Sequence, residues 1–224
     1  GEWHSGTWEQ VNKLNGNQPV ILLIPSADVL LTRTVLVTTN TRQLKQALPY
    51  ALEESLVGEV EDQHFVWQAE NDNTLAVAVI ERERLKAWMQ LLKQQKLRAK
   101  AILPDVFALP VNEAMPTLWQ REGQAWVRTD ALSGFSCPAA SLSLLVNSLF
   151  DPELQERKLQ LYTDQPADWQ QAFTILPEPQ PNHLLQKSLQ AGMGLNLLAG
   201  YQDDSMSSFN RNWRRWKLAA GLAI

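Results

Sequence analysis

The sequence predicts a mixed α and β protein built of two related halves. Strand-like apolar runs occur in pairs around polar turns, as in residues 60–68 and 74–80. Each set of strands is followed by a segment with apolar residues at helical spacing, as in residues 81–97, and then by a further strand-like run. With 224 residues, the chain is long enough for two lobes that each bury a core.

The first half starts with two apolar runs, residues 18–24 and 29–37, separated by turn-forming residues. This pattern predicts a hairpin. Thr41 is expected to cap a helix that stops before Pro49, because proline inside a helix removes a hydrogen bond and clashes with the preceding turn. Residues 49–57 are then expected to form a second short helix.

Three further elements complete the first half. Residues 60–68 and 74–80 are expected to form a hairpin around a polar turn. Residues 81–97 place Leu85 and Leu92 on one face, which predicts an amphipathic helix. Residues 98–103 are expected to return as a strand that ends at the following proline.

The second half repeats this order. Residues 117–121 and 124–130 predict a hairpin around a Glu-Gly turn. Residues 132–137 offer serine and cysteine side chains but no nearby base, and are interpreted as a loop before a helix at 139–150. Residues 158–163 alternate between polar and apolar side chains, as in a strand.

The C-terminal end combines cations, tryptophans and an apolar run in the order typical of a membrane anchor. The membrane flank consists of Arg211, Trp213, Arg214, Arg215, Trp216 and Lys217. Cations mark the cytoplasmic side of a membrane span, and tryptophan suits the headgroup layer. The apolar residues 218–224 are too few for a span, which needs about 20 residues. We therefore expect a protein cut inside its anchor; an amphipathic C-terminal helix is the alternative.

These patterns divide the chain into four expected regions. Residues 1–110 form a first lobe, and residues 111–200 form a second lobe that includes an Asn-Leu-Leu segment. Residues 201–217 form a basic helix next to the membrane. Residues 218–224 begin a transmembrane helix.

Composition and charge restrict the partners. The formal net charge is −4, and the cations of the membrane flank leave an acidic body. An acidic body argues against nucleic acid, whereas the basic end fits anionic lipid headgroups. The single cysteine, Cys137, cannot form an internal disulfide, which is typical of a cytoplasmic protein.

The sequence contains no recognisable catalytic motif. His4, His64 and His183 are far apart and belong to no metal-ligand pattern. The nucleophile pattern GxSxG and the phosphate-binding pattern GxxxxGK[ST] are absent, and Gly192-Met193-Gly194 lacks the third glycine of GxGxxG. We therefore expect no catalytic residue, no metal and no cofactor, and a binding or scaffolding role.

Four pieces of the sequence together resemble the cytoplasmic region of the type II secretion system protein L family. The first is Leu-Pro-Tyr-Ala-Leu-Glu-Glu-Ser-Leu at residues 48–56. The second is the helix and return strand that end in Leu-Pro-Asp at 103–105. The third is Leu-Asn-Leu-Leu-Ala-Gly-Tyr at 195–201, and the fourth is Trp-Arg-Arg-Trp-Lys at 213–217.

The resemblance implies a fold related to actin-like ATPases, made of β-rich subdomains. It also implies a single-pass subunit of the bacterial inner membrane, with this fragment on the cytoplasmic side. The implied partners are the N-terminal domain of the GspE-like secretion ATPase, the GspM-like protein M subunit, the inner-membrane protein F, a second copy of the chain and membrane lipid. In the analogous pilus system, PilM holds an Asn-Leu-Leu peptide of PilN, so we expect Leu195, Asn196, Leu197 and Leu198 to dock onto the body.

Two features bear on what such a protein does. Actin-like ATPases hold phosphate with an Asp-x-Gly turn, and neither hairpin turn, at 25–28 or 121–124, carries one. We therefore expect the fold without ATP hydrolysis. The acidic residues Glu59, Glu61 and Asp62 are a candidate surface for steering a basic partner, with a solvated turn as the alternative. A membrane-tethered actin-like nucleotide-binding enzyme and a generic membrane adaptor remain alternative functions.

Overall fold

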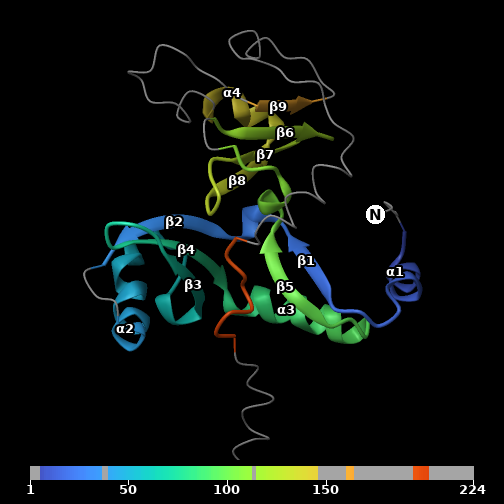
Figure 1. Cartoon of the computed structure of the whole chain (residues 1–224), viewed down its shortest axis with the longest axis horizontal. Coiled ribbons are helices and arrows are strands. Elements are labelled where there is room, and N and C mark those ends of the chain that lie inside the picture. Colours follow the sequence, from blue (N-terminus) through green and yellow to red (C-terminus); the bar gives the residue numbers. More distant parts are fainter. Residues whose placement is uncertain (1–5, 37–39, 113–114, 146–159, 164–193, 202–224) are drawn as a thin grey trace, which may run out of the picture.

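The computed structural model of the chain describes residues 6–36, 40–112, 115–145, 160–163 and 194–201 (Figure 1). These residues form three β-sheets with helices between them. The first half of the chain forms a two-stranded and a three-stranded sheet, and the second half forms a four-stranded sheet. In Figure 1 the four-stranded sheet lies above the other two.

The first two strands of the chain belong to different sheets. β1 (Val20–Ile24) pairs in parallel with β5 (Ala99–Pro104). β2 (Leu30–Val35) pairs antiparallel with β4 (Thr74–Glu81). The prediction of a hairpin between these strands is therefore wrong, because the turn Ser26–Asp28 is a 3-10 helix that directs the chain from one sheet to the other. A short apolar run predicts a strand but not its partner.

Three other predicted elements of the first half are confirmed: the hairpin, the amphipathic helix and the return strand. β3 (Gln63–Ala69) forms an antiparallel hairpin with β4, and the sheet order is β2-β4-β3. α3 (Arg82–Gln94) follows β4 and buries Leu85 and Leu92. It leads to β5, which ends at Pro104 as expected.

α2 (Thr41–Ala51) continues through Pro49, so the prediction of a break there is wrong. Pro49 lies in the last turn, where its missing N–H removes one hydrogen bond shortly before the helix ends. The helix is capped by Asn40 rather than by Thr41, because the Asn40 side chain accepts hydrogen bonds from backbone N–H groups of the first turn. The expected second helix is reduced to a 3-10 turn at Glu53–Ser55.

The second half contains the four-stranded sheet in the order β8-β7-β6-β9. β6 (Thr117–Arg121) and β7 (Gln124–Arg128) form the predicted hairpin. β9 (Gln160–Thr163) confirms the described part of the strand predicted at 158–163 and runs parallel to β6. Of the helix expected at 139–150, the described part is a 3-10 turn followed by α4 (Leu142–Leu145).

The interpretation of residues 132–137 as a loop is wrong, because β8 (Gly134–Pro138) pairs with β7. Phe135 and Cys137 pack against the core of the four-stranded sheet. A Cβ atom at Gly134 would lie 2.5 Å from the carbonyl oxygen of Val127, so glycine is needed where the two strands approach. Phe135 is the one large apolar residue of this strand, which is too little to predict a strand from sequence, whereas its pairing with β7 defines it.

α1 (Trp8–Asn15) was not predicted. The backbone N–H of Thr7 donates to the side-chain oxygen of Gln10 at 2.7 Å, one half of a capping box. The spacing of Thr7 and Gln10 was therefore the signal that could have located this helix.

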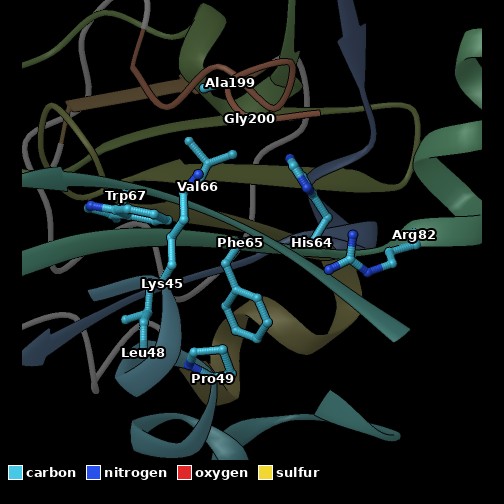
Figure 2. Close-up of a pocket in the computed structure, with 10 residues that line it drawn as sticks. All are labelled: Lys45, Leu48, Pro49, His64, Phe65, Val66, Trp67, Arg82, Ala199 and Gly200. Carbon is cyan, nitrogen blue, oxygen red and sulfur yellow. The ribbon is translucent and has the colours of Figure 1, made fainter. Parts of the chain in front are cut away.

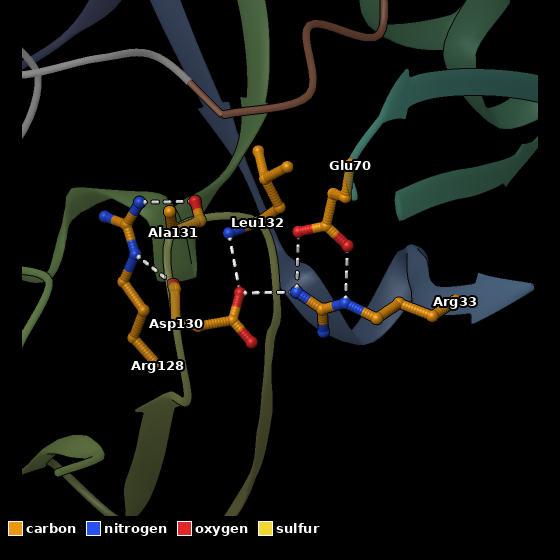
Figure 3. Close-up of polar contacts among 6 residues, drawn as sticks. All are labelled: Arg33, Glu70, Arg128, Asp130, Ala131 and Leu132. Carbon is orange, nitrogen blue, oxygen red and sulfur yellow. Dashed lines mark hydrogen bonds and ion pairs between the residues drawn. The ribbon is translucent and has the colours of Figure 1, made fainter. Parts of the chain in front are cut away.

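Arg128 is a buried cation that ties the two halves together. It is 3% exposed, and its guanidinium donates to the carbonyl oxygens of Phe107 and Leu109, both at 2.6 Å. It also donates to the carbonyl oxygens of Asp130 at 3.1 Å and Ala131 at 2.9 Å (Figure 3). Burial lowers the pKa of Arg128 to about 10, so the side chain remains charged at neutral pH.

A second polar contact joins the halves at the surface (Figure 3). Arg33 on β2 donates to both carboxylate oxygens of Glu70, at 2.7 and 3.1 Å, and to Asp130 at 2.9 Å. The same Asp130 oxygen accepts the N–H of Leu132 at 2.8 Å. Burial opposes ionisation of Asp130, but the hydrogen bond and charge of Arg33, together with the backbone hydrogen bonds from Leu132 and Ser133, outweigh burial and lower its pKa. This exposed network adds less stability than Arg128, because water and salt screen it.

Replacing Arg128 with methionine tests this connection. We expect Arg128→Met to lower the free energy of unfolding by about 3 kcal/mol or more, because several buried carbonyl groups lose their only strong donor. The control Arg121→Met removes a partly exposed arginine that pairs with the exposed Glu122, and it is expected to change the free energy by no more than about 0.5 kcal/mol. Urea denaturation followed by tryptophan fluorescence measures both, and equal effects of the two substitutions would contradict the role of Arg128.

Candidate functional site

Residues 194–201 form a segment, here called the docked segment, that lies between β3 and β5 (Figure 1, red). The N–H of Leu197 donates to the carbonyl oxygen of Ile102 on β5 at 2.9 Å. The side-chain oxygen of Asn196 accepts the N–H groups of Ile102 and Leu198, both at 3.1 Å. The Asn196 amide therefore replaces the backbone carbonyl that a neighbouring strand would supply.

The apolar residues of the docked segment enter the core of the first half. Leu195 and Leu197 are buried, and Leu198 packs at the edge of the same core. Chain order had suggested that the segment belongs with the second lobe, whereas its hydrogen bonds and its buried side chains are made with β3 and β5. The boundary between the lobes near residue 110 stays a prediction.

Gly194 begins the docked segment with a positive φ of 51°. A Cβ atom at this position would lie 2.7 Å from the ring of Phe107. Only glycine tolerates both the left-handed backbone and this close approach. The docked segment therefore packs closely against Phe107 already at its first residue, Gly194.

His64 fastens the docked segment to β3. Its Nε2 lies 2.9 Å from the carbonyl oxygen of Leu197, so Nε2 carries the proton and donates. The ring of Tyr201 meets the imidazole edge-on at 6.0 Å. His64 is 5% exposed, and burial lowers its pKa from the ordinary value of 6.5. His64 is therefore neutral at neutral pH.

A hollow of about 400 Å³ lies next to the docked segment, between β3 and α2; we call it the β3 groove (Figure 2). Figure 2 shows Phe65 pointing toward Pro49, with Lys45 and Arg82 on opposite sides of Phe65. The groove is lined by Lys45, Leu48, Pro49, His64, Phe65, Val66, Trp67, Arg82, Ala199 and Gly200. Its only charged lining residues are two cations.

The acidic candidates lie at the surface, close to a second hollow. Glu59, Glu61 and Asp62 are all exposed. Glu59 and Asp62 line a cavity of about 740 Å³ that also touches β8, whereas the backbone oxygen of Glu61 accepts a hydrogen bond from Arg82 at 3.0 Å. The structure therefore places two of the three carboxylates at one cavity rim.

The polar residues at the ends of the parallel strands β1 and β5 bond to one another. The Ser26 N–H and hydroxyl donate to one carboxylate oxygen of Asp105, at 2.9 and 2.5 Å. The other oxygen accepts the indole N–H of Trp126 at 2.8 Å, and the Ser26 hydroxyl accepts the N–H of Val106 at 2.9 Å. Ligands often bind at such strand ends, but here these groups brace the turn.

Within the described ranges, no cluster of three or more His, Cys, Asp or Glu residues could hold a metal ion. Cys137 is partly buried, and burial raises the pKa of its thiol, which disfavours the reactive thiolate. His4 and His183 lie outside the described residues.

The predicted membrane region lies almost wholly outside the described residues, which stop at Tyr201. The predicted membrane flank lies wholly outside them; it comprises Arg211, Trp213, Arg214, Arg215, Trp216 and Lys217. Among the helices that the structure does describe, none combines the length and hydropathy that crossing a bilayer requires.

The described residues thus define a mixed α and β domain of several sheets. Between β3 and β5 this domain binds a segment of its own chain, residues 194–201. Residues 5–203 match the family model of type II secretion system protein L. The chain belongs to this family.

Individual relatives agree with the family assignment. Type II secretion system protein L of Klebsiella pneumoniae is 33% identical over 150 residues, 65% of this chain and 37% of that protein. The protein L of Vibrio cholerae is 30% identical over 227 residues, 97% of this chain and 55% of that protein. The chain therefore spans about half, or less, of the length of these curated relatives.

A solved structure confirms the fold. The cytoplasmic domain of EpsL, an inner membrane component of the type II secretion system of Vibrio cholerae, is similar with a TM-score of 0.73 and 26% identity. The match covers 85% of this chain and 83% of that domain. The prediction of a mixed fold related to actin-like ATPases is thereby confirmed.

Substitution of Asn196 tests the docked segment. Asn196→Ala leaves the buried N–H of Ile102 without its acceptor, which we expect to cost about 1–3 kcal/mol of unfolding free energy. Amide hydrogen exchange at Ile102 should also become faster. The control Gln94→Ala, at an exposed position of α3, is expected to change the free energy by less than about 0.5 kcal/mol. Unchanged stability and exchange in Asn196→Ala would show that the amide does not hold the segment.

The lowered pKa of His64 predicts a pH-dependent stability. The unfolded chain takes up a proton near the ordinary pKa of 6.5, where folded His64 remains neutral. The free energy of unfolding should therefore fall as the pH drops from about 7.5 through about 6.5, until the lower folded-state pKa is reached. In His64→Gln this contribution is absent. Urea midpoints of both proteins between about pH 7.5 and 5.5 measure the difference, and parallel curves would refute the assignment.

Proposed function

We propose that this chain is the cytoplasmic part of an inner-membrane platform subunit of a type II secretion system, and that it recruits the secretion ATPase to the membrane. Its family membership supports the first part, as does its likeness to a domain described as cytoplasmic and as part of an inner membrane component. The sequence order of the membrane flank supports a single span after the body.

The docked segment is the observation that carries this proposal. It buries Leu195 and Leu197 and bonds to both β3 and β5, immediately before the part of the chain that leads to the membrane flank. A segment fixed in this way ties the chain to the core of the body directly before the predicted anchor, so a load between body and membrane would be borne by buried contacts at residues 194–201. Such coupling is what a platform subunit needs.

The N-terminal domain of the GspE-like ATPase is the proposed cytoplasmic partner, and Glu59, Glu61 and Asp62 are its proposed docking surface. All three carboxylates are exposed, and Glu59 and Asp62 flank a hollow large enough to receive side chains. Negative charge at this rim would steer a basic partner and raise its association rate. The GspM-like subunit, the inner-membrane protein F and a second copy of this chain are further proposed partners, and anionic lipid is the proposed contact of the basic end.

We also propose that the domain acts by binding and has no enzymatic activity. The Ser26 and Asp105 side chains already bond to each other at the strand ends. A calorimetric titration with ATP and magnesium tests this against a nucleotide-binding enzyme. Binding with a dissociation constant of about 10 μM or tighter would favour the enzyme.

Charge reversal tests the recruitment surface. Calorimetry of this chain with the N-terminal domain of a cognate secretion ATPase is expected to give saturable one-to-one binding. Glu61→Lys combined with Asp62→Lys should lower the association rate about tenfold at low salt, with a smaller loss at high salt. The matched control Glu9→Lys with Glu122→Lys, on α1 and the β6-β7 turn, should leave the rate nearly unchanged.

The two possible failures are distinguishable. If Glu61→Lys with Asp62→Lys leaves the association rate unchanged, the acidic residues are not the docking surface, but recruitment of the ATPase by another surface still stands. Absence of binding at about 100 μM of both proteins would count against recruitment by this domain and favour the membrane adaptor.

A further inference from the structure

The outer edge of β3 is open where it borders the β3 groove. The sheet order β2-β4-β3 makes β3 an edge strand. The N–H of Glu70 donates to the carbonyl oxygen of Thr74 at 2.8 Å, and the register continues without a shift to Gln63. In an antiparallel ladder this alternation directs the backbone groups of Phe65 and Trp67 away from β4.

These outward groups have no backbone partner among the described residues. The docked segment contacts β3 at His64, so it covers the beginning of the strand rather than the stretch at Phe65 and Trp67. Figure 1 likewise shows no strand on the outer side of β3. An exposed row of unpaired N–H and C=O groups is a template for strand addition unless charge or shape selects against it.

The side chains around this edge select one kind of strand. Lys45 on α2 and Arg82 at the start of α3 stand on opposite sides of the groove, and no acidic residue lines it. The Nε of Arg82 donates to the backbone oxygen of Glu61, which fixes the direction of its guanidinium. These two cations attract carboxylates and repel basic side chains. The charge of the groove therefore favours binding of acidic strands and disfavours binding of basic ones.

The floor of the groove supplies apolar contact. Phe65 and Trp67 both pack against the cluster that contains Leu48 of α2, and the ring of Phe65 points toward Pro49 (Figure 2). A strand added to β3 would place alternate side chains over this surface and the others toward solvent and the cations. Backbone pairing, apolar contact and charge therefore all favour an extended segment in which apolar and acidic residues alternate.

We propose that the β3 groove binds an extended acidic segment of a partner protein by adding it as a strand to β3. This interaction does not depend on the proposed ATPase recruitment, which uses a surface of opposite charge. We infer that the bound segment carries carboxylates at alternate positions, because the charged residues that line the groove are cations. This local positive charge contrasts with the net charge of −4 of the whole chain.

The test uses the full 224-residue chain and a fluorescein-labelled peptide of alternating valine and glutamate. Fluorescence anisotropy is expected to show binding with a dissociation constant of about 10–100 μM, and a valine-lysine peptide should bind at least tenfold more weakly. Lys45→Glu should weaken the acidic peptide about tenfold or more, whereas the matched control Lys13→Glu, on α1, should change its affinity less than about twofold.

Backbone methylation separates strand addition from simple charge attraction. A peptide with every second backbone nitrogen methylated keeps its charges but cannot donate to the edge of β3, and it should lose binding. The amide resonances of Phe65, Val66 and Trp67 should shift with the unmethylated peptide. Equal binding of the methylated peptide, equal binding to Lys45→Glu, or no binding at about 1 mM would overturn the proposal.

Two other occupants would also overturn it. If the acidic peptide binds only when Asp203→Lys and Asp204→Lys are introduced, the groove receives this chain's own acidic residues. If sedimentation shows a dimer that Lys45→Glu dissociates, it receives a second copy.

Discussion

The fold of the first half depends on satisfying the buried backbone of β5. Ile102 is fully buried, and its N–H and C=O point away from β1, where the three-stranded sheet does not reach them. Water is excluded from this position, so the two groups must find partners within the chain. Asn196 and Leu197 supply them from more than ninety residues further along the sequence. Without the docked segment, the core of the first half would lose the buried side chains of Leu195 and Leu197 and become exposed to water on that side.

The connection to the second half follows the same physical rule with different groups. The carbonyl oxygens of Phe107 and Leu109 lie in the turn after β5, and the guanidinium of Arg128 on β7 satisfies both. One step earlier along the chain, Asp105 joins the 3-10 turn at Ser26 to the indole of Trp126. Buried polar groups thus fix the halves relative to each other, while the surface pair of Arg33 and Asp130 adds a screened contribution.

The candidate sites were predictable to different degrees. The resemblance singled out residues 195–198, because they match the family's Asn-Leu-Leu motif, and the acidic run at 59–62 was visible in the local sequence. Lys45, Arg82 and the edge of β3 gave no such signal. They lie on separate elements, and only the packing of α2 against β3 brings the cations and the unpaired strand edge to one groove.

The sequence by itself determined the class of fold, the β3-β4 and β6-β7 hairpins and the amphipathic face of α3, because these depend on residues close together in the chain. Only the tertiary structure decided that β1 pairs with β5, that β8 is a strand and that Pro49 remains within α2. Each of these outcomes depends on which distant groups become buried together. A local pattern records a residue's preference for burial, whereas the identity of its partner is set by the free energy of the whole packed chain.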